Sequence, residues 1–148
     1  MKVFTSYFAN VTTLKKCGVV PISIARWSPR NWTGERMLWL APTPYMLSDN
    51  CTRDEYIRLY KEICNRVNID LFVKELNRIG NGNDVALLCY ERPGDFCHRH
   101  ILAEHLKSLG LEVTEFNGIL YETQKSRELM EAEQAQPRKP SPEQLSLF

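Results

Sequence analysis

VALLCY, the stretch from Val85 to Tyr90, is a continuous apolar run, and such a run predicts a strand buried on both faces. Strands of this kind occupy the centre of parallel sheets that are covered by helices. The next stretch, His98 to Leu109, carries apolar residues at helical spacing and is closed by Gly110, and Glu112 to Phe116 predicts another strand. A strand, a helix and a strand in this order predict a right-handed parallel crossover.

The chain before this run predicts the remaining strands. Lys2 to Ala9 and Val19 to Arg26 are β-branched and aromatic runs typical of strands, with a short helix between them that ends at Cys17-Gly18. Ser28 to Asn50 has no sustained period, which predicts a long ordered loop.

Two further helices are predicted between this loop and the central strand. Thr52 and Glu55 form a capping-box pattern that marks a helix start. Asp70 is expected to start the second helix, and Gly80-Asn81-Gly82-Asn83 to end it. We therefore expect an α/β fold with a mainly parallel sheet flanked by helices.

The domain organisation follows from length and from a change of composition near the C-terminus. A chain of 148 residues with 43% hydrophobic residues is long enough for one core. Residues 131–148 contain three prolines and no apolar side chain larger than alanine before Leu145. We predict a single domain over residues 1–130 and a flexible, disordered tail over residues 131–148.

Charge and cysteine content narrow the classes of function. A formal net charge of +1 gives no global attraction to nucleic acid or anionic membranes, so any contact with nucleic acid must be local. The five cysteines are an odd number, and no secretion signal precedes them, which favours a reducing cytoplasm. No run is long enough to span a membrane, so a membrane protein is not expected.

A group of reactive side chains brackets the predicted central strand and the helix after it. Ligands in parallel α/β sheets sit beyond the carboxyl ends of strands, close to helix N-termini. An arginine there can clamp a phosphate or carboxylate, a histidine can exchange a proton, and a cysteine at a helix start can become a nucleophile. We predict catalytic roles for Cys97, His98 and Glu91, and ligand-binding roles for Arg26, Cys89 and Arg99.

Structural explanations compete with these roles. Cys89 can be a small buried hydrophobic residue, and Arg99 with Glu91 can form an ion pair that fixes the loop. Cys89, Cys97 and His98 offer three zinc ligands, but their spacing matches no standard zinc finger or ribbon. We therefore predict neither a metal nor a cofactor.

Three tryptophans with interleaved arginines form a second candidate feature. Trp27, Trp32 and Trp39 alternate with basic residues and could stack on single-stranded nucleic acid. The competing and preferred explanation is that these rings pack on the domain itself.

Leu87 to Leu106, with the sequence LLCYERPGDFCHRHILAEHL, resembles the signature of the bacterial domain-of-unknown-function 488 family. The opening FTSYFA and a strand that ends at Arg26 are similar to the family's N-terminal part, so the resemblance covers roughly Met1 to Phe116. Family members usually carry an acidic residue just before that arginine, where this chain has Ile24-Ala25. The resemblance implies an α/β fold and a pocket built from the six residues named above, and it supplies no reaction.

The last five residues, Gln144-Leu145-Ser146-Leu147-Phe148, resemble the peptide by which bacterial polymerases and repair proteins bind the DNA sliding clamp. Gln144 can fix the register of such a peptide, and Leu145, Leu147 and Phe148 can fill an apolar pocket. A flexible linker before it would let the domain remain free while the peptide is docked.

These observations lead to one main functional hypothesis and two rivals. We expect an accessory protein of DNA replication or repair, tethered to the clamp, whose domain binds or processes a nucleotide or nucleic-acid end. The first rival is a non-catalytic module that binds a small anion, and the second is a thiol-dependent cytoplasmic enzyme unrelated to DNA. The sequence leaves open whether the protein is an enzyme.

Overall fold

The computed structural model of the chain describes residues 1–91 and 97–135. The chain divides into two compact units, Met1–Phe116 and Asn117–Phe148. The first unit contains a sheet with its covering helices, and the described part of the second is a single helix, α5 (Gly118–Ala135). Within the described ranges, no helix is both long and apolar enough to cross a membrane.

The sheet of the first unit has five strands in the order β3-β2-β4-β1-β5, and every neighbouring pair is parallel. This confirms the α/β fold with a parallel sheet that the sequence predicted. The strands are β1 (Val3–Tyr7), β2 (Val20–Ser23), β3 (Glu35–Arg36), β4 (Val85–Cys89) and β5 (Val113–Glu115).

Strand β4 is the central strand, as its apolar run predicted, and all five of its residues are buried. Successive side chains of a strand point to opposite faces. Val85 and Leu87 belong to the main hydrophobic cluster with residues of α2 (Arg53–Asn65), α3 (Ile69–Gly80) and α4 (His98–Ser108). Ala86 and Leu88 are buried without belonging to this cluster. Both faces of β4 are therefore covered.

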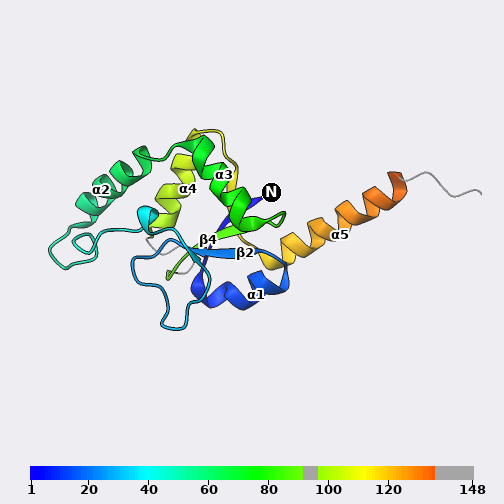
Figure 1. The fold of residues 1–148 in the computed structure, drawn as a ribbon, viewed down its shortest axis with the longest axis horizontal. Coiled ribbons are helices and arrows are strands. Elements are labelled where there is room, and N and C mark those ends of the chain that lie inside the picture. The colour runs from blue at the N-terminus through cyan, green and yellow to red at the C-terminus, as the bar shows by residue number, and fades with distance from the viewer. Residues whose placement is uncertain (92–96, 136–148) are drawn as a thin grey trace, which may run out of the picture. The chain divides into compact units, whose positions relative to one another are not determined.

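Among the described helices of the first unit, α1, α3 and α4 pack directly on the sheet, and α2 packs mainly against α4. Figure 1 shows α3 and α4 on one side of the strands and α1 on the other. The main cluster packs residues of α2, α3 and α4 against the sheet, including Tyr60, Phe72, Leu76, Leu102 and Leu106. The helices are α1 (Val11–Lys16), α2 (Arg53–Asn65), α3 (Ile69–Gly80) and α4 (His98–Ser108).

The helix boundaries follow local capping chemistry. The Thr52 side chain accepts a hydrogen bond from the Glu55 backbone N–H at 3.2 Å, which confirms the predicted start of α2. Helix α3 begins one residue before Asp70, because the Asn68 side chain caps it by accepting from the Leu71 N–H. Its end is set by Asn81, which takes the left-handed conformation with φ 46° and ψ 49°.

The predicted long loop contains two short elements that its sequence did not reveal. These are β3, at the edge of the sheet, and a 3-10 turn η2 (Leu38–Leu40). The loop is anchored where the Tyr60 hydroxyl donates to the Leu40 carbonyl at 2.7 Å, and the Leu40 side chain is buried in the main cluster. The loop is therefore ordered, as predicted.

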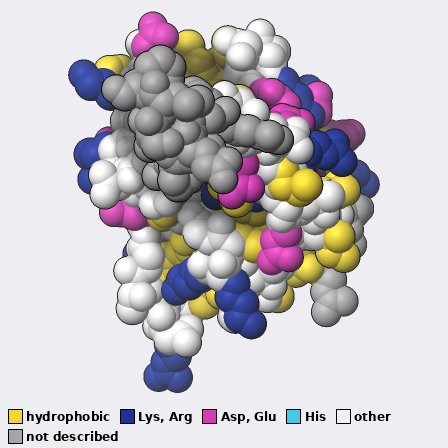
Figure 2. Space-filling view, turned by 90° about the vertical axis from the view of Figure 1, so that its right-hand side faces the viewer, with side chains coloured by type: hydrophobic (Ala, Val, Ile, Leu, Met, Phe, Trp, Pro, Cys, Tyr) yellow, Lys and Arg dark blue, Asp and Glu magenta, His cyan; other side chains and the backbone are white. Residues whose placement is uncertain are grey.

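Helix α5 was not predicted, and it continues to Ala135, into the segment that the sequence suggested was a tail. Residues 136–148, with the clamp-like peptide, lie outside the described residues. On the face drawn in Figure 2, Lys and Arg side chains are interspersed with Asp and Glu side chains. This mixture agrees with the net charge of +1.

Candidate functional site

A pocket of about 320 Å³ lies beyond the carboxyl ends of β2 and β4, at the start of α4. This is the position where parallel α/β sheets bind their ligands. The candidate residues were expected at this position because each of them follows one of these strands or lies at the start of the helix. The pocket is lined by Ala25, Arg26, Trp27, Pro42, Leu47, Tyr56, Cys89, Tyr90, Glu91 and His98.

The structure brings all six predicted residues into one region. Arg26, Cys89, Glu91 and His98 line the pocket itself. The other two, Cys97 and Arg99, do not line it but touch residues that do. Their individual roles remain predictions.

Arg99 is fully buried, and its guanidinium is already bound on several sides by the protein. It forms a salt bridge with Glu115 of β5, where Nη2 lies 2.9 Å from Oε1, and it also donates to the Glu91 backbone carbonyl. Nη1 further contacts the Cys89 sulfur at 2.9 Å. Arg99 therefore forms its ion pair with Glu115, and not with Glu91 as the sequence suggested. Its contacts connect β5 with the end of β4.

His98 is 5% exposed and fixed in one orientation. Its Nε2 lies 2.9 Å from the Ile24 carbonyl oxygen, and because a carbonyl can only accept, Nε2 carries the proton. Burial, reinforced by the positive charge of Arg99, lowers the pKa of His98 to about 4. His98 is thus a neutral ring at neutral pH, with an unprotonated Nδ1.

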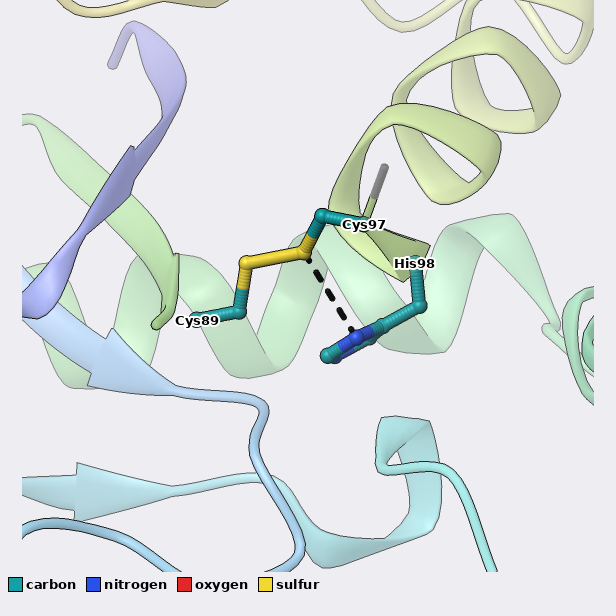
Figure 3. A group of neighbouring side chains, drawn as sticks. All are labelled: Cys89, Cys97 and His98. Carbon is teal, nitrogen blue, oxygen red and sulfur yellow. Dashed lines mark hydrogen bonds between the residues drawn. A yellow bond between two sulfur atoms is a disulfide. The ribbon is translucent and has the colours of Figure 1, made fainter. Parts of the chain in front are cut away.

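Cys89 and Cys97 are joined by a disulfide, which the sequence analysis did not foresee (Figure 3). Cys89 ends β4, and Cys97 is the N-cap residue of α4. The Cys97 sulfur is also 3.7 Å from Nδ1 of His98. The two sulfurs and the ring nitrogen therefore form one compact group at the base of the pocket.

Arg26 differs from Arg99 because, among the described residues, only its Nε has a hydrogen-bond partner. Its Nε donates to the Pro42 carbonyl at 2.9 Å, which holds the side chain at the rim. No described residue hydrogen-bonds to its two terminal nitrogens. Arg26 is partly exposed, so this positive group is available to a ligand in the pocket.

Aromatic side chains form much of the pocket wall. Trp27 is 61% exposed and Tyr90 is 52% exposed, and the Tyr90 hydroxyl donates to the Trp27 carbonyl at 2.7 Å. Tyr56 of α2 contributes a third ring, and burial together with the nearby charge of Glu91 raises the pKa of its hydroxyl. Tyr56 therefore stays protonated and can donate a hydrogen bond.

Tyr56, Tyr90 and Glu115 also belong to this region, and none of the three was predicted from the sequence. Tyr56 falls at an apolar position of the helix predicted to start at Thr52, although a tyrosine there also carries a hydrogen-bond donor. Tyr90 follows Cys89 directly at a strand end, which was the available signal. Glu115 gave no signal, because pairing with Arg99 depends on how β5 lies beside β1.

The three tryptophans have different surroundings. Only Trp27 lies at the pocket, whereas the Trp39 ring meets Phe72 of α3 edge-on and the Trp32 ring meets Phe8 edge-on. Trp32 lines a separate, wider hollow of about 800 Å³ that also includes Lys15 and Arg36. Trp32 and Trp39 therefore pack against the domain.

Comparison with known proteins gives one finding. The family described as the active DUF488-N3 subclade, DUF488-N3a, matches residues 10–110. No curated protein and no solved structure matches the chain. The matched range contains every predicted site residue of the domain, from Arg26 to Arg99, and it leaves out the β1 segment that the sequence resemblance had included. Because the match covers more than half of the chain, the protein belongs to the DUF488 family, in the DUF488-N3a subclade.

Proposed function

We propose that the domain binds a nucleotide or a nucleic-acid end in the pocket beside Arg26, and that the protein serves DNA replication or repair. The observation that supports this most is the combination, in one pocket, of an uncommitted guanidinium with exposed aromatic rings. A volume of about 320 Å³ suits a ligand of mononucleotide size.

The phosphate of such a ligand would pair with Arg26. Guanidinium groups bind phosphate through two parallel N–H donors, and Arg26 has two terminal nitrogens without a described partner. Helix α4 begins beside the pocket and has no acidic residue in its first turn, so the positive end of its dipole is not offset there. Both features favour an anionic group at this position.

The base and sugar have partners in the remaining wall. Trp27 and Tyr90 present ring surfaces on which a base can stack. Glu91 lines the same pocket with an exposed carboxylate, which can accept hydrogen bonds from sugar hydroxyls. A nucleotide would therefore contact more of the pocket-lining side chains than a simple anion would.

Isothermal titration calorimetry of the purified full chain with deoxynucleoside monophosphates tests this proposal. Arg26→Gln should weaken binding by about tenfold or more, because it removes a charged hydrogen bond to phosphate. Arg30→Gln, an exposed arginine of the same loop outside the pocket, is the matched control and should bind as the unchanged chain does. No binding at millimolar nucleotide, or equal binding by both variants, would contradict the proposal.

Inorganic phosphate separates this proposal from the small-anion alternative. A module that recognises only an anion would bind phosphate as tightly as a mononucleotide, and Trp27→Ala would have no effect on it. A nucleotide site would bind phosphate much more weakly and lose affinity with that substitution.

The clamp-binding part of the proposal rests on the C-terminal sequence. All five positions from Gln144 to Phe148 fit the clamp-binding pattern. Docking of this peptide would concentrate the domain on DNA, where nucleotides and nucleic-acid ends arise. A cytoplasmic location is part of the same proposal, because the bacterial clamp acts there.

Thiol chemistry is a second candidate, favoured by the contact between the Cys97 sulfur and His98 Nδ1. In the reduced protein, this nitrogen could accept a hydrogen bond from the Cys97 thiol and orient it, while the start of α4 would favour the nucleophilic thiolate. Such an enzyme would lose turnover with Cys97→Ser and keep it without the C-terminal peptide. A clamp-dependent activity would show the opposite dependence on the peptide.

A further inference from the structure

The base of the pocket gathers three side chains that are common metal ligands. The Sγ atoms of Cys89 and Cys97 and a ring nitrogen of His98 all lie within 4.8 Å of one another, and all three residues are buried. Figure 3 shows the two sulfurs bonded to each other and the imidazole ring of His98 beside the Cys97 sulfur. The spacing rules for zinc fingers and ribbons do not apply to this group, because the fold assembles it from the end of β4 and the start of α4.

The orientation of His98 leaves its Nδ1 atom able to bind a metal ion. Its Nε2 proton is held by the Ile24 carbonyl, so the lone pair of Nδ1 points toward the Cys97 sulfur. Histidines that bind metals almost always donate their other ring N–H to a carbonyl or carboxylate in this way.

The distance between the Cys97 sulfur and His98 fits a tetrahedral ion, whereas the two sulfurs are bonded to each other in this structure and must separate on reduction before an ion can bind. Zinc lies about 2.3 Å from sulfur and about 2.05 Å from nitrogen, so tetrahedral geometry places these two ligand atoms about 3.6 Å apart. The observed distance between Cys97 Sγ and His98 Nδ1 is 3.7 Å. The Cα atoms of Cys89 and Cys97 are 7.5 Å apart, wider than the roughly 4.4–6.8 Å usual for a disulfide, which leaves room for an ion between the separated sulfurs.

The surrounding charges also balance. Two thiolates neutralise a divalent cation, and the adjacent guanidinium of Arg99 is neutralised by Glu115. The Nη1 of Arg99 already contacts the Cys89 sulfur at 2.9 Å, as an outer partner of a metal-bound thiolate would. A buried site with no net charge avoids the cost of burying an unpaired ion.

We propose that the reduced protein binds one zinc ion through Cys89, Cys97 and Nδ1 of His98. Two of these ligands line the pocket, so the fourth coordination position faces the space that we assign to the ligand. Three protein ligands and one open position are typical of catalytic rather than structural zinc sites. Because zinc binding is measured without nucleotide, it can succeed or fail independently of the proposed function.

Cobalt(II) is the probe for the first test, since its absorption reports thiolate ligation and coordination geometry. The full chain, purified with a reducing agent, should bind one equivalent with a thiolate-to-cobalt charge-transfer band, and one equivalent of zinc should remove that band. Cys89→Ser, Cys97→Ser and His98→Gln should each weaken binding at least tenfold. Cys64→Ser, which changes a buried cysteine of α2 outside the group, is the matched control and should keep the band.

A second measurement avoids substitutions that disturb folding. Zinc should protect Cys89 and Cys97 of the reduced, unchanged chain from alkylation, and a chelator should restore their reaction, with Cys17 and Cys51 unaffected. The proposal is overturned if the reduced chain binds no cobalt or shows no thiolate band. It is equally overturned if zinc leaves the alkylation of Cys89 and Cys97 unchanged.

Discussion

Arg99 links the stability of the site to its chemistry at the scale of a single residue. Its side chain has no exposed surface, and it connects β5, the end of β4 and the Cys89 sulfur. Replacing a buried charge that has several partners is costly, because each partner is left without its hydrogen bond or its opposite charge. Arg99 is better understood as a positioning residue than as a group free to clamp a ligand.

The first prediction follows from this position. Arg99→Leu should lower the free energy of unfolding by about 2–4 kcal/mol, because it leaves Glu115 without its cation in a partly buried place. Urea denaturation of the two proteins measures the difference. The control is Arg58→Ala, which breaks the solvent-exposed pair Arg58–Glu62 and should cost about 0.5 kcal/mol or less. Equal costs for both substitutions would contradict the role given to Arg99.

A second prediction concerns a cysteine outside the site. Burial raises the pKa of the Cys64 thiol to about 11, so at pH 8 only about 0.1% of it is thiolate. Iodoacetamide at pH 8 should therefore modify the partly exposed Cys17 and Cys51 and spare Cys64 until the protein unfolds. Mass spectrometry of the alkylated peptides measures each site. Rapid labelling of Cys64 in the folded protein would mean that α2 opens readily.

At this scale, the sequence predicted which residues gather but not what each one contacts. Cys89, Glu91 and the Cys97–Arg99 triplet were found because a strand end and a helix start are visible in the sequence. The partner of Arg99 was not, because Glu115 reaches it only through the pairing of β5 with β1. The fixed tautomer of His98 likewise depends on the Ile24 carbonyl, 74 residues away in the chain.

At the scale of elements, α2 offers a test of local capping. Thr52→Ala should lower the free energy of unfolding by about 1 kcal/mol, because it removes the acceptor for the Glu55 N–H. Thermal or urea unfolding followed by circular dichroism measures the loss. Thr33→Ala, at an exposed loop position, is the control and should leave stability nearly unchanged. A similar loss in both variants would show that the cap contributes nothing specific.

The elements themselves were largely predictable, and the reasons differ from one to another. VALLCY identified β4 because only a strand covered on both faces is apolar in every position. The two-residue strand β3 was missed because its exposed Glu35 and Arg36 have no strand pattern and pair only by lying beside β2. Helix α5 was missed because it lacks a clear apolar face, with large apolar side chains such as Ile119, Leu120 and Leu129 well exposed.

At the scale of the whole molecule, the proposed function needs two parts that act in sequence. The peptide would bring the protein to the clamp, and the pocket would bind a ligand there. If the two parts are independent, removing one should leave the other intact. This separation gives the proposal a test that neither the domain nor the peptide provides alone.

The last prediction uses that separation. A labelled peptide covering Gln136 to Phe148 should bind a purified bacterial sliding clamp with micromolar affinity, about −8 kcal/mol, in fluorescence anisotropy. Replacing Leu147 and Phe148 with alanine should abolish this binding, because these side chains are the expected apolar anchors. The same double substitution in the full chain should abolish clamp binding and leave nucleotide affinity unchanged. A peptide that fails to bind, or binds equally well without its anchors, would remove the reason for a role on DNA and leave the pocket to be explained by small-anion or thiol chemistry.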